Sequence, residues 1–333
     1  MRALTTRRPR ATVLALAAAL AATSLTGIGP VAAGPRQAPE GAAGLPVLET
    51  PPSSPLAVWP AHAPSGVERF AATTSPDVEA VPATPAGGPQ SIIGAPESVI
   101  GADGRERLRL DKTSVFPLSA IGQVEFVQDG RTYICTGYLL DGNSVLTAGH
   151  CSFDGGEDDP VDSASFFPGR ERQNGVVVNP WGGCAVTAVW APDKWRFDAT
   201  PAHDYAVMQL DDGCDFSESA GSFGLFTLDG ANAFAGRRLR VEGYPGDKSN
   251  GSRWKMVGEV DRNSVNFLHY PMDTFGGQSG SPLFKWNRPE CGGPCSAGVH
   301  AYGASGNPPM NSGPMMTQGR IGTIAAVAQA NGG

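Results

Sequence analysis

Short apolar or alternating runs, separated by clusters of Gly, Pro, Asn and Asp, fill the chain from residue 98 onward. Runs of this length and polarity are typical of β-strands, and the residues between them are those that form turns. The pattern therefore predicts an all-β sandwich or barrel arrangement. Only the end differs, because residues 317–330 have a helix-compatible apolar spacing that stops at a terminal Asn-Gly-Gly. The runs that carry the prediction are 120–127, 132–140, 185–190, 205–210, 238–241 and 296–301.

The first third of the 333-residue chain has a different composition. Residues 1–33 fit a secretory signal peptide, with a basic start, an apolar stretch over 11–28 and Val-Ala-Ala before the cleavage point. The pair Arg7-Arg8 leaves twin-arginine export open beside the general route for unfolded chains. Residues 34–97 are rich in Pro, Ala and Gly and lack aliphatic periodicity, so we expect them to be largely disordered. With nothing folded expected before them, a removable propeptide is favoured over a linker.

The heptapeptide 276–282, Gly-Gly-Gln-Ser-Gly-Ser-Pro, places Ser279 on a turn between glycines. Glycines adopt backbone conformations that side chains forbid, so the N–H groups of Gly277 and Ser279 can converge on one point as an oxyanion hole. A serine hydroxyl is a poor nucleophile at neutral pH and requires a base together with a group that orients that base. The turn therefore predicts acyl-transfer chemistry, provided that both partners occur elsewhere in the chain.

His150 and Asp204 are the partners that the sequence offers. His150 follows a short apolar run, which places its imidazole at the end of a β-strand, and Asp204 stands at the mouth of the alternating strand 205–210. The order His, Asp, Ser along the chain is one of three known for this type of catalytic triad. We therefore predict that His150 is the base, Asp204 its orienting acid and Ser279 the nucleophile.

Each of the three residues also has a simpler structural interpretation. The glycine-rich turn could be an ordinary loop, His150 could be a packed residue or a metal ligand beside Cys151, and Asp204 could cap a helix or close a turn. The conjunction of three suitable contexts in one chain order favours catalysis.

These motifs resemble those of the chymotrypsin-fold serine proteases, and more specifically the bacterial glutamyl endopeptidases, which are secreted enzymes that cut after glutamate. The resemblance runs from about residue 98 to about residue 321 and implies two antiparallel six-stranded β-barrels with a short C-terminal helix. It places a first barrel at about 98–215, a second at about 216–316 and the helix at about 317–330, within a protease domain spanning 98–333. The residues that carry it are 98–103, 147–151, 204–205, 243–248, 272–282 and 293–296.

All six cysteines fall after residue 98, and an even number in an exported chain predicts three disulfides, for which fifteen pairings exist. The protease fold commonly has a bridge where Cys135 and Cys151 stand. Cys291 and Cys295 enclose only Gly-Gly-Pro and can close a tight loop, which leaves Cys184 with Cys214. No histidine sits at metal-ligand spacing from Cys291 and Cys295, so no metal site is expected there.

Two residues depart from trypsin or match it only in part. Trypsin-like zymogens have an aspartate immediately before the serine, which pairs with a new N-terminus, whereas this chain has Gln278. A neutral amide cannot form that ion pair, so activation must work differently. Six residues before the serine stands Asp273, which in a trypsin-like enzyme would select Arg or Lys in the substrate residue before the cut, P1. The glutamyl endopeptidases also carry an acid there, so the alternative of Arg or Lys specificity stays open.

The resemblance assigns glutamate recognition to His300 and Thr274. The segment 298–303 is expected to be a strand that pairs with substrate and walls the P1 pocket. His300 stands at the position of the family's glutamate-binding histidine, and Thr274 at that of a hydroxyl donor. A histidine simply packed on the barrel surface is the alternative. Glu97-Ser98 joins the propeptide to the family-like mature start, so we predict cleavage there, by the enzyme itself or a relative.

Charge restricts the partners only weakly. The chain has 25 Lys and Arg against 32 Asp and Glu, a net charge of −7, and no basic stripe or aromatic platform suggests nucleic acid. The acids in residues 155–162 are expected to be a solvated loop, with a calcium site as the alternative. We expect a secreted, monomeric serine endopeptidase zymogen that acts on proteins or peptides, without cofactor, metal or membrane association once the signal is removed. A catalytically silent relative that acts as a binding module is a third hypothesis.

Overall fold

The computed structural model describes residues 44–53, 58–63, 73–75, 81–82, 98–108, 115–264 and 266–331, and only the backbone of 73–75, 81–82 and 331. The predicted signal peptide and Glu97 lie outside the described residues.

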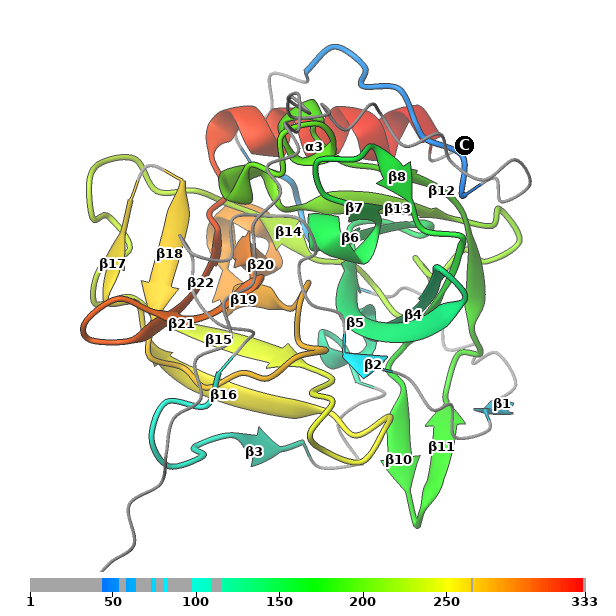
Figure 1. Cartoon of the computed structure of the whole chain (residues 1–333), viewed down its shortest axis with the longest axis horizontal. Helices are drawn as coiled ribbons and strands as arrows, with labels where there is room; N and C mark the ends of the chain where they lie inside the picture. The colour runs from blue at the N-terminus through cyan, green and yellow to red at the C-terminus, as the bar shows by residue number, and fades with distance from the viewer. Residues whose placement is uncertain are drawn as a thin grey trace, which may run out of the picture. The chain divides into compact units, whose positions relative to one another are not determined.

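A closed barrel of six strands, coloured green in Figure 1, forms the first half of the molecule. Neighbouring strands pair antiparallel in the order β5-β4-β9-β12-β13-β6, and pairing between β5 and β6 closes the circle. Burial alternates along β9 and β12, as expected for strands with one face on a core. The six strands are β4 (Ile121–Gln128), β5 (Arg131–Leu139), β6 (Ser144–Thr147), β9 (Ser163–Pro168), β12 (Cys184–Trp190) and β13 (Ala206–Leu210).

The second half contains two sheets, most of whose strands are drawn in yellow to orange in Figure 1. A six-stranded sheet has the order β14-β20-β19-β15-β16-β3, and a four-stranded sheet has the order β17-β18-β22-β21. An isolated bridge between Gly298 and Met315 joins them, so the predicted second barrel is built from two sheets rather than one continuous ladder. The strands are β3 (Glu106–Arg107), β14 (Gly224–Leu225), β15 (Arg238–Gly243), β16 (Trp254–Glu259), β17 (Arg262–Asn263), β18 (Phe267–Tyr270), β19 (Pro282–Arg288), β20 (Gly293–Val299), β21 (Tyr302–Ser305) and β22 (Met310–Pro314).

The remaining elements are short and connect or flank the barrels. Asp129 and Gly130 both have positive φ, which suits the two-residue turn of the hairpin β4–β5. Asn174 and Gly175 do the same between β10 and β11. These elements are β1 (Thr73–Ser75), β2 (Val81–Pro82), β7 (Phe153–Asp154), β8 (Asp159–Pro160), β10 (Glu171–Gln173), β11 (Val176–Asn179), the helix α2 (Asp193–Arg196), and the 3-10 helices η1 (Leu118–Ala120), η2 (Gly149–Cys151), η3 (Pro201–His203) and η4 (Pro289–Cys291).

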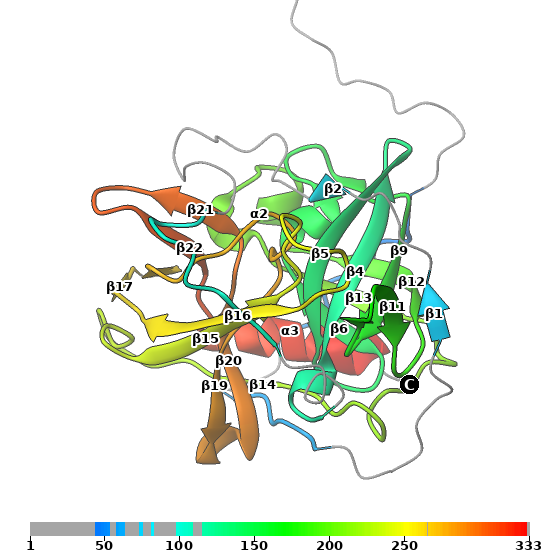
Figure 2. The ribbon, with the colours of Figure 1, turned by 90° about the horizontal axis from the view of Figure 1, so that it is seen from below.

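The C-terminal helix α3 (Gln318–Asn331) packs its apolar residues into the core of the first barrel. The helix lies near β13 in both views. Figure 2 also shows the hairpin that β19 and β20 form within the six-stranded sheet. The helix agrees with the sequence prediction within one residue at each end, and the all-β fold class with a short terminal helix is confirmed.

Within residues 34–97, which the sequence predicts to be largely disordered, the structure describes segments that pack on the first barrel. Residues 44–53 and 58–63, which we call the strap, belong to the same compact unit as the barrels. Leu45 and Leu48 pack against the core of the first barrel, and Trp59 is buried in it. Composition does not indicate these contacts, because a few apolar side chains that pack on a barrel surface need no periodicity of their own.

Candidate active site

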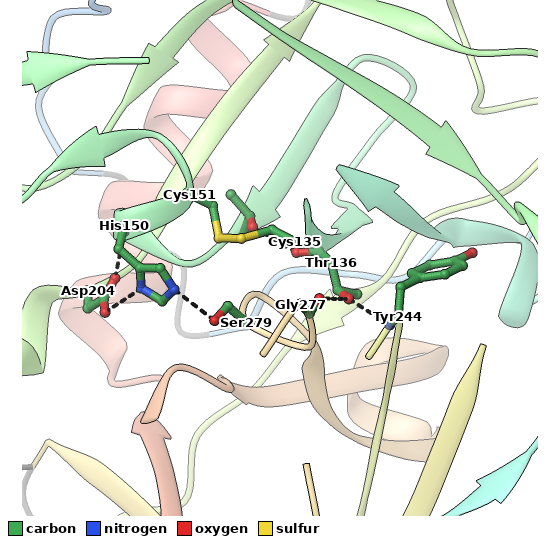
Figure 3. The surroundings of a disulfide bond; sticks show 9 residues. Cys135, Thr136, His150, Cys151, Asp204, Tyr244, Gly277 and Ser279 are labelled. Atoms are coloured by element: carbon green, nitrogen blue, oxygen red, sulfur yellow. Dashed lines mark hydrogen bonds and ion pairs between the residues drawn. A yellow bond between two sulfur atoms is a disulfide. The ribbon is translucent and has the colours of Figure 1, made fainter. Parts of the chain in front are cut away.

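His150, Asp204 and Ser279 meet although they are distant in the chain (Figure 3). Asp204 Oδ2 lies 2.9 Å from His150 Nδ1, and His150 Nε2 lies 2.7 Å from Ser279 Oγ. The other carboxylate oxygen, Oδ1, accepts a hydrogen bond from the backbone N–H of His150 at 2.9 Å. All three residues are buried, so the carboxylate holds both the ring and its backbone in one orientation.

The first barrel brings His150 and Asp204 together. His150 lies in η2 directly after β6, Asp204 lies just before β13, and these two strands pair antiparallel. Gly149 is needed between them, because a Cβ at this position would lie 2.9 Å from Asp204 Oδ1. A disulfide between Cys135 in β5 and Cys151 in η2 links these two elements (Figure 3). The structure also pairs Cys184 with Cys214 and Cys291 with Cys295.

The turn that carries Ser279 depends on its glycines. Gly277 and Gly280 have φ values of +100° and +87°, in the region that favours glycine. A Cβ on Gly277 would lie 2.5 Å from Tyr244 O, and one on Gly280 would lie 1.9 Å from Thr136 O. The backbone therefore takes the close-packed course that an oxyanion turn requires.

Two side chains that hold this turn extend the sequence analysis. Gln278 Oε1 accepts a hydrogen bond from Phe275 N at 3.1 Å, so the amide that replaces the trypsin-like acid ties the turn to itself. Thr136 Oγ1 donates to Gly277 O at 2.9 Å and accepts from Tyr244 N at 3.0 Å (Figure 3). Thr136 gave no sequence signal beyond its place next to Cys135.

His300 lies in the gap between β20 and β21, which corrects the predicted continuous strand over residues 298–303. Its backbone N–H donates to Ser281 O, and its carbonyl accepts from Gly280 N, so it is fixed directly to the serine turn. Burial, together with the nearby His150, lowers the pKa of His300 to about 3. The imidazole is therefore neutral at ordinary pH.

Tyr270 and Thr274 complete the polar surroundings of this histidine. The buried Tyr270 hydroxyl lies 2.5 Å from His300 Nδ1, a contact that sequence analysis missed because nothing distinguishes Tyr270 from a core residue of β18. Thr274 is fully buried, and its hydroxyl has no hydrogen-bond partner among the described residues. A buried hydroxyl of this kind has bonding capacity to offer a substrate group.

Asp273 is buried and turned toward the start of the protease domain. Its two carboxylate oxygens accept hydrogen bonds from Ile100 N and Gly104 N, both at 2.7 Å. The side chain of Asn311 holds the same segment by bonding both backbone groups of Ser98. Asp273 thus positions residues 98–104.

The described residues contain one group with metal-ligand spacing, Cys135, His150 and Cys151. Both sulfurs are in a disulfide and cannot act as thiolate ligands, so this group does not fit a metal. The acids expected in the loop 155–162 form no such group among the described residues, and Asp158 pairs with Arg196 instead.

Comparisons with known proteins identify relatives of this chain. A family model described as a trypsin-like peptidase domain matches residues 135–290. A glutamyl endopeptidase of Bacillus licheniformis is 34% identical over 237 residues, which cover 71% of this chain and 69% of that protein. An extracellular metalloprotease of Bacillus subtilis is 32% identical over 214 residues, covering 63% and 64%. A solved structure of a Glu endopeptidase in complex with MPD has 27% identity and a TM-score of 0.57, covering 71% of this chain and all of that one.

The fold and these matches define a trypsin-like serine endopeptidase. The chain belongs to the family of the bacterial glutamyl endopeptidases.

Proposed function

We propose that this protein is a secreted endopeptidase that cleaves proteins or peptides after glutamate, with His150, Asp204 and Ser279 as its catalytic triad. The observation that carries the proposal is the unbroken chain of contacts from the Asp204 carboxylate through His150 to Ser279 Oγ. The Ser279 hydroxyl attacks the carbonyl carbon of the scissile bond while its proton passes to His150 Nε2. The backbone N–H groups of Gly277 and Ser279 bind the resulting oxyanion.

The second half of the reaction uses the same groups. His150 returns its proton to the leaving amine, which departs and leaves an ester between Ser279 Oγ and the new carboxyl end. Water then attacks that ester, with His150 again as the base. Asp204 keeps the proton of the neutral ring on Nδ1 and stabilises the imidazolium that forms in each half.

Glutamate selection follows from His300, Thr274 and Tyr270. A carboxylate that enters a buried pocket must find donors, since an unpaired buried charge is costly. Tyr270 Oη and His300 Nδ1 are within hydrogen-bond distance. We assign the hydroxyl as the donor, so that the neutral ring carries its proton on Nε2 and can donate it to the substrate. The Thr274 hydroxyl supplies a second donor.

The alternative of Arg or Lys specificity requires Asp273 to face the substrate. Both of its oxygens are instead occupied by backbone N–H groups of residues 98–104, which favours glutamate selection. The test is His300→Ala, assayed on matched peptides with Glu or Ala at P1. We expect kcat/KM to fall roughly 10- to 100-fold for Glu, the range of a hydrogen bond to a charge, and to change little for Ala. Equal losses on both peptides would remove His300 from glutamate recognition.

Maturation is proposed to remove residues 1–33 as a signal peptide and to cut the propeptide at Glu97-Ser98. Both backbone groups of Ser98, the proposed first residue of the mature chain, bond the Asn311 side chain. The glutamate before the proposed cut matches the proposed specificity. None of the helices in the described ranges is long and apolar enough to cross a membrane. We propose a monomer that binds no nucleic acid. N-terminal sequencing of the secreted enzyme should give Ser98, and a start far from it would remove the cleavage proposal.

A further inference from the structure

The strap binds the protease body at two separate places, and neither is the active site. Its first part, residues 44–53, lies along the first barrel and reaches α3, where Ser53 Oγ lies 2.8 Å from Thr323 Oγ1. Its second part, residues 58–63, lies against β14 and η4. The contacts described for the strap do not include His150, Asp204 or Ser279.

The first part completes the edge of a barrel strand. β12 pairs with β13 along one side, but on the other side β9 reaches only Cys184 and Ala185. The strap occupies the vacant edge, because Leu48 N donates to Val189 O and Val189 N donates to Pro46 O, both at 2.8 Å. Val189 is fully buried, so without the strap two of its backbone groups would lose their partners.

The second part does the same for β14, which pairs with β20 on its other side. Trp59 and Leu225 exchange two backbone hydrogen bonds of 3.1 and 2.9 Å, and His62 and Ser222 exchange two more. Gly224 permits this approach, since a Cβ there would lie 2.6 Å from Trp59 O.

Trp59 anchors the strap in the core. Its side chain is part of the same buried cluster as the first barrel and α3, and the residue is only 6% exposed. The indole N–H donates to Leu140 O at 2.8 Å in a buried position. Release of the strap would therefore open a cavity of tryptophan size and leave a buried carbonyl unpaired.

We propose that the strap stays bound after maturation, so that the mature enzyme consists of two chains held together without a covalent bond. The strap contains no cysteine, and the proposed cut at Glu97-Ser98 lies between it and the body. The inference rests on the proposed function in one respect, since two chains arise only if the cut at Glu97-Ser98 occurs. The contacts that hold the strap do not depend on catalysis. A segment of the predicted propeptide would then be a permanent part of the fold.

The test uses the full chain carrying Ser279→Ala, in which the junction Glu97-Ser98 is replaced by the recognition sequence of an unrelated site-specific protease. After cutting, the sample is passed over a size-exclusion column at micromolar concentration, and the peak is analysed by intact-mass spectrometry. We expect the fragment that contains residues 44–63 to co-elute with the body in equal amounts. A body that elutes alone would overturn the proposal. Failure of self-cleavage is a separate result, read from N-terminal sequencing of the active enzyme.

A second experiment tests whether Trp59 anchors the strap. It compares Trp59→Ala with the matched control Val47→Ala, each in the cleavable Ser279→Ala protein. Val47 belongs to the same strap but is 37% exposed, so its truncation should leave the fragment bound. Trp59→Ala should release the fragment after cutting and lower the Tm of the uncut chain by roughly 10 °C. Unchanged retention and Tm in Trp59→Ala would contradict the proposed anchor. If that variant does not fold, the cut chain with Trp59 intact still decides the proposal.

Discussion

Asp204 and Asp273 are both buried aspartates close to the serine turn, yet the two regions that they organise differ in their contacts. Asp204 bonds the ring and the backbone of His150, a side chain that can carry a proton. The carboxylate of Asp273 accepts hydrogen bonds from two backbone N–H groups among the described residues, those of Ile100 and Gly104. In the proposed function, the acid that contacts a histidine takes part in catalysis, whereas the acid bonded to backbone donors shapes the pocket. The same residue type would then serve chemistry in one region and architecture in the other.

The largest effect is expected where the chain of contacts from Asp204 ends. Ser279→Ala removes the nucleophile without changing the surrounding turn, so kcat should fall by about a million-fold while the fold and peptide binding persist. Steady-state hydrolysis gives the first quantity, and thermal unfolding with peptide titration gives the second. Substantial remaining peptidase activity, in a preparation free of contaminating protease, would refute Ser279 as the nucleophile.

The two aspartates can be compared directly by the same substitution. Asp204→Asn should lower kcat by about ten-thousand-fold, because an amide no longer holds the required tautomer of His150. Asp273→Asn should leave kcat/KM for Glu peptides within about ten-fold of the wild-type value. The amide NH₂ cannot accept a hydrogen bond, so one backbone N–H loses its acceptor and the fold is destabilised. Comparable losses of activity in both variants would break the distinction between the two regions.

The three residues of the proposed triad could be selected from the sequence because each lies in its own short local pattern, and the structure brings them into contact. His150 ends an apolar run, Asp204 begins one, and Ser279 sits between glycines. The role of Asp273 could not be read in this way, because its partners Ile100 and Gly104 are 173 and 169 residues away.

The fold also combines features that local sequence predicts with features that depend on distant contacts. Four strands of the first barrel, β4, β5, β12 and β13, coincide with apolar or alternating runs in the sequence, which are a local property. The break at His300 does not, because it reflects hydrogen bonds to the serine turn and not any propensity of residues 298–303. The packing of the strap could not be predicted from local sequence, because Trp59 is buried by residues that are distant in the chain.

Acid should weaken the pocket region through His300. Its pKa is about 3 in the folded state and near 6.5 when unfolded, so between these values only the unfolded chain takes up the proton. This contribution to stability is intact above pH 6.5 and is lost as pH falls, by about 1.4 kcal/mol per pH unit. Urea unfolding of Ser279→Ala with and without His300→Gln, at pH 7 and pH 4.5, measures it. We expect the variant with Gln to lose less stability on acidification, and equal losses would contradict a neutral buried His300.

A smaller effect should follow from Tyr270→Phe, which removes the hydroxyl that faces His300 Nδ1 and keeps the ring in the core. The tautomer of His300 would no longer be fixed, so kcat/KM for Glu peptides should fall about 3- to 10-fold, with little change for Ala at P1. Loss of activity on both peptides alike would indicate a packing role for Tyr270.

The P1 preference of the purified mature enzyme tests the account most directly. The measurement is kcat/KM on otherwise identical peptides with Glu, Gln, Arg or Lys at P1, at neutral pH. The account predicts the highest value for Glu, roughly 10- to 100-fold above Gln, because only the carboxylate makes charged hydrogen bonds to His300 and Thr274. Highest values for Arg and Lys, abolished by Asp273→Asn, would contradict it.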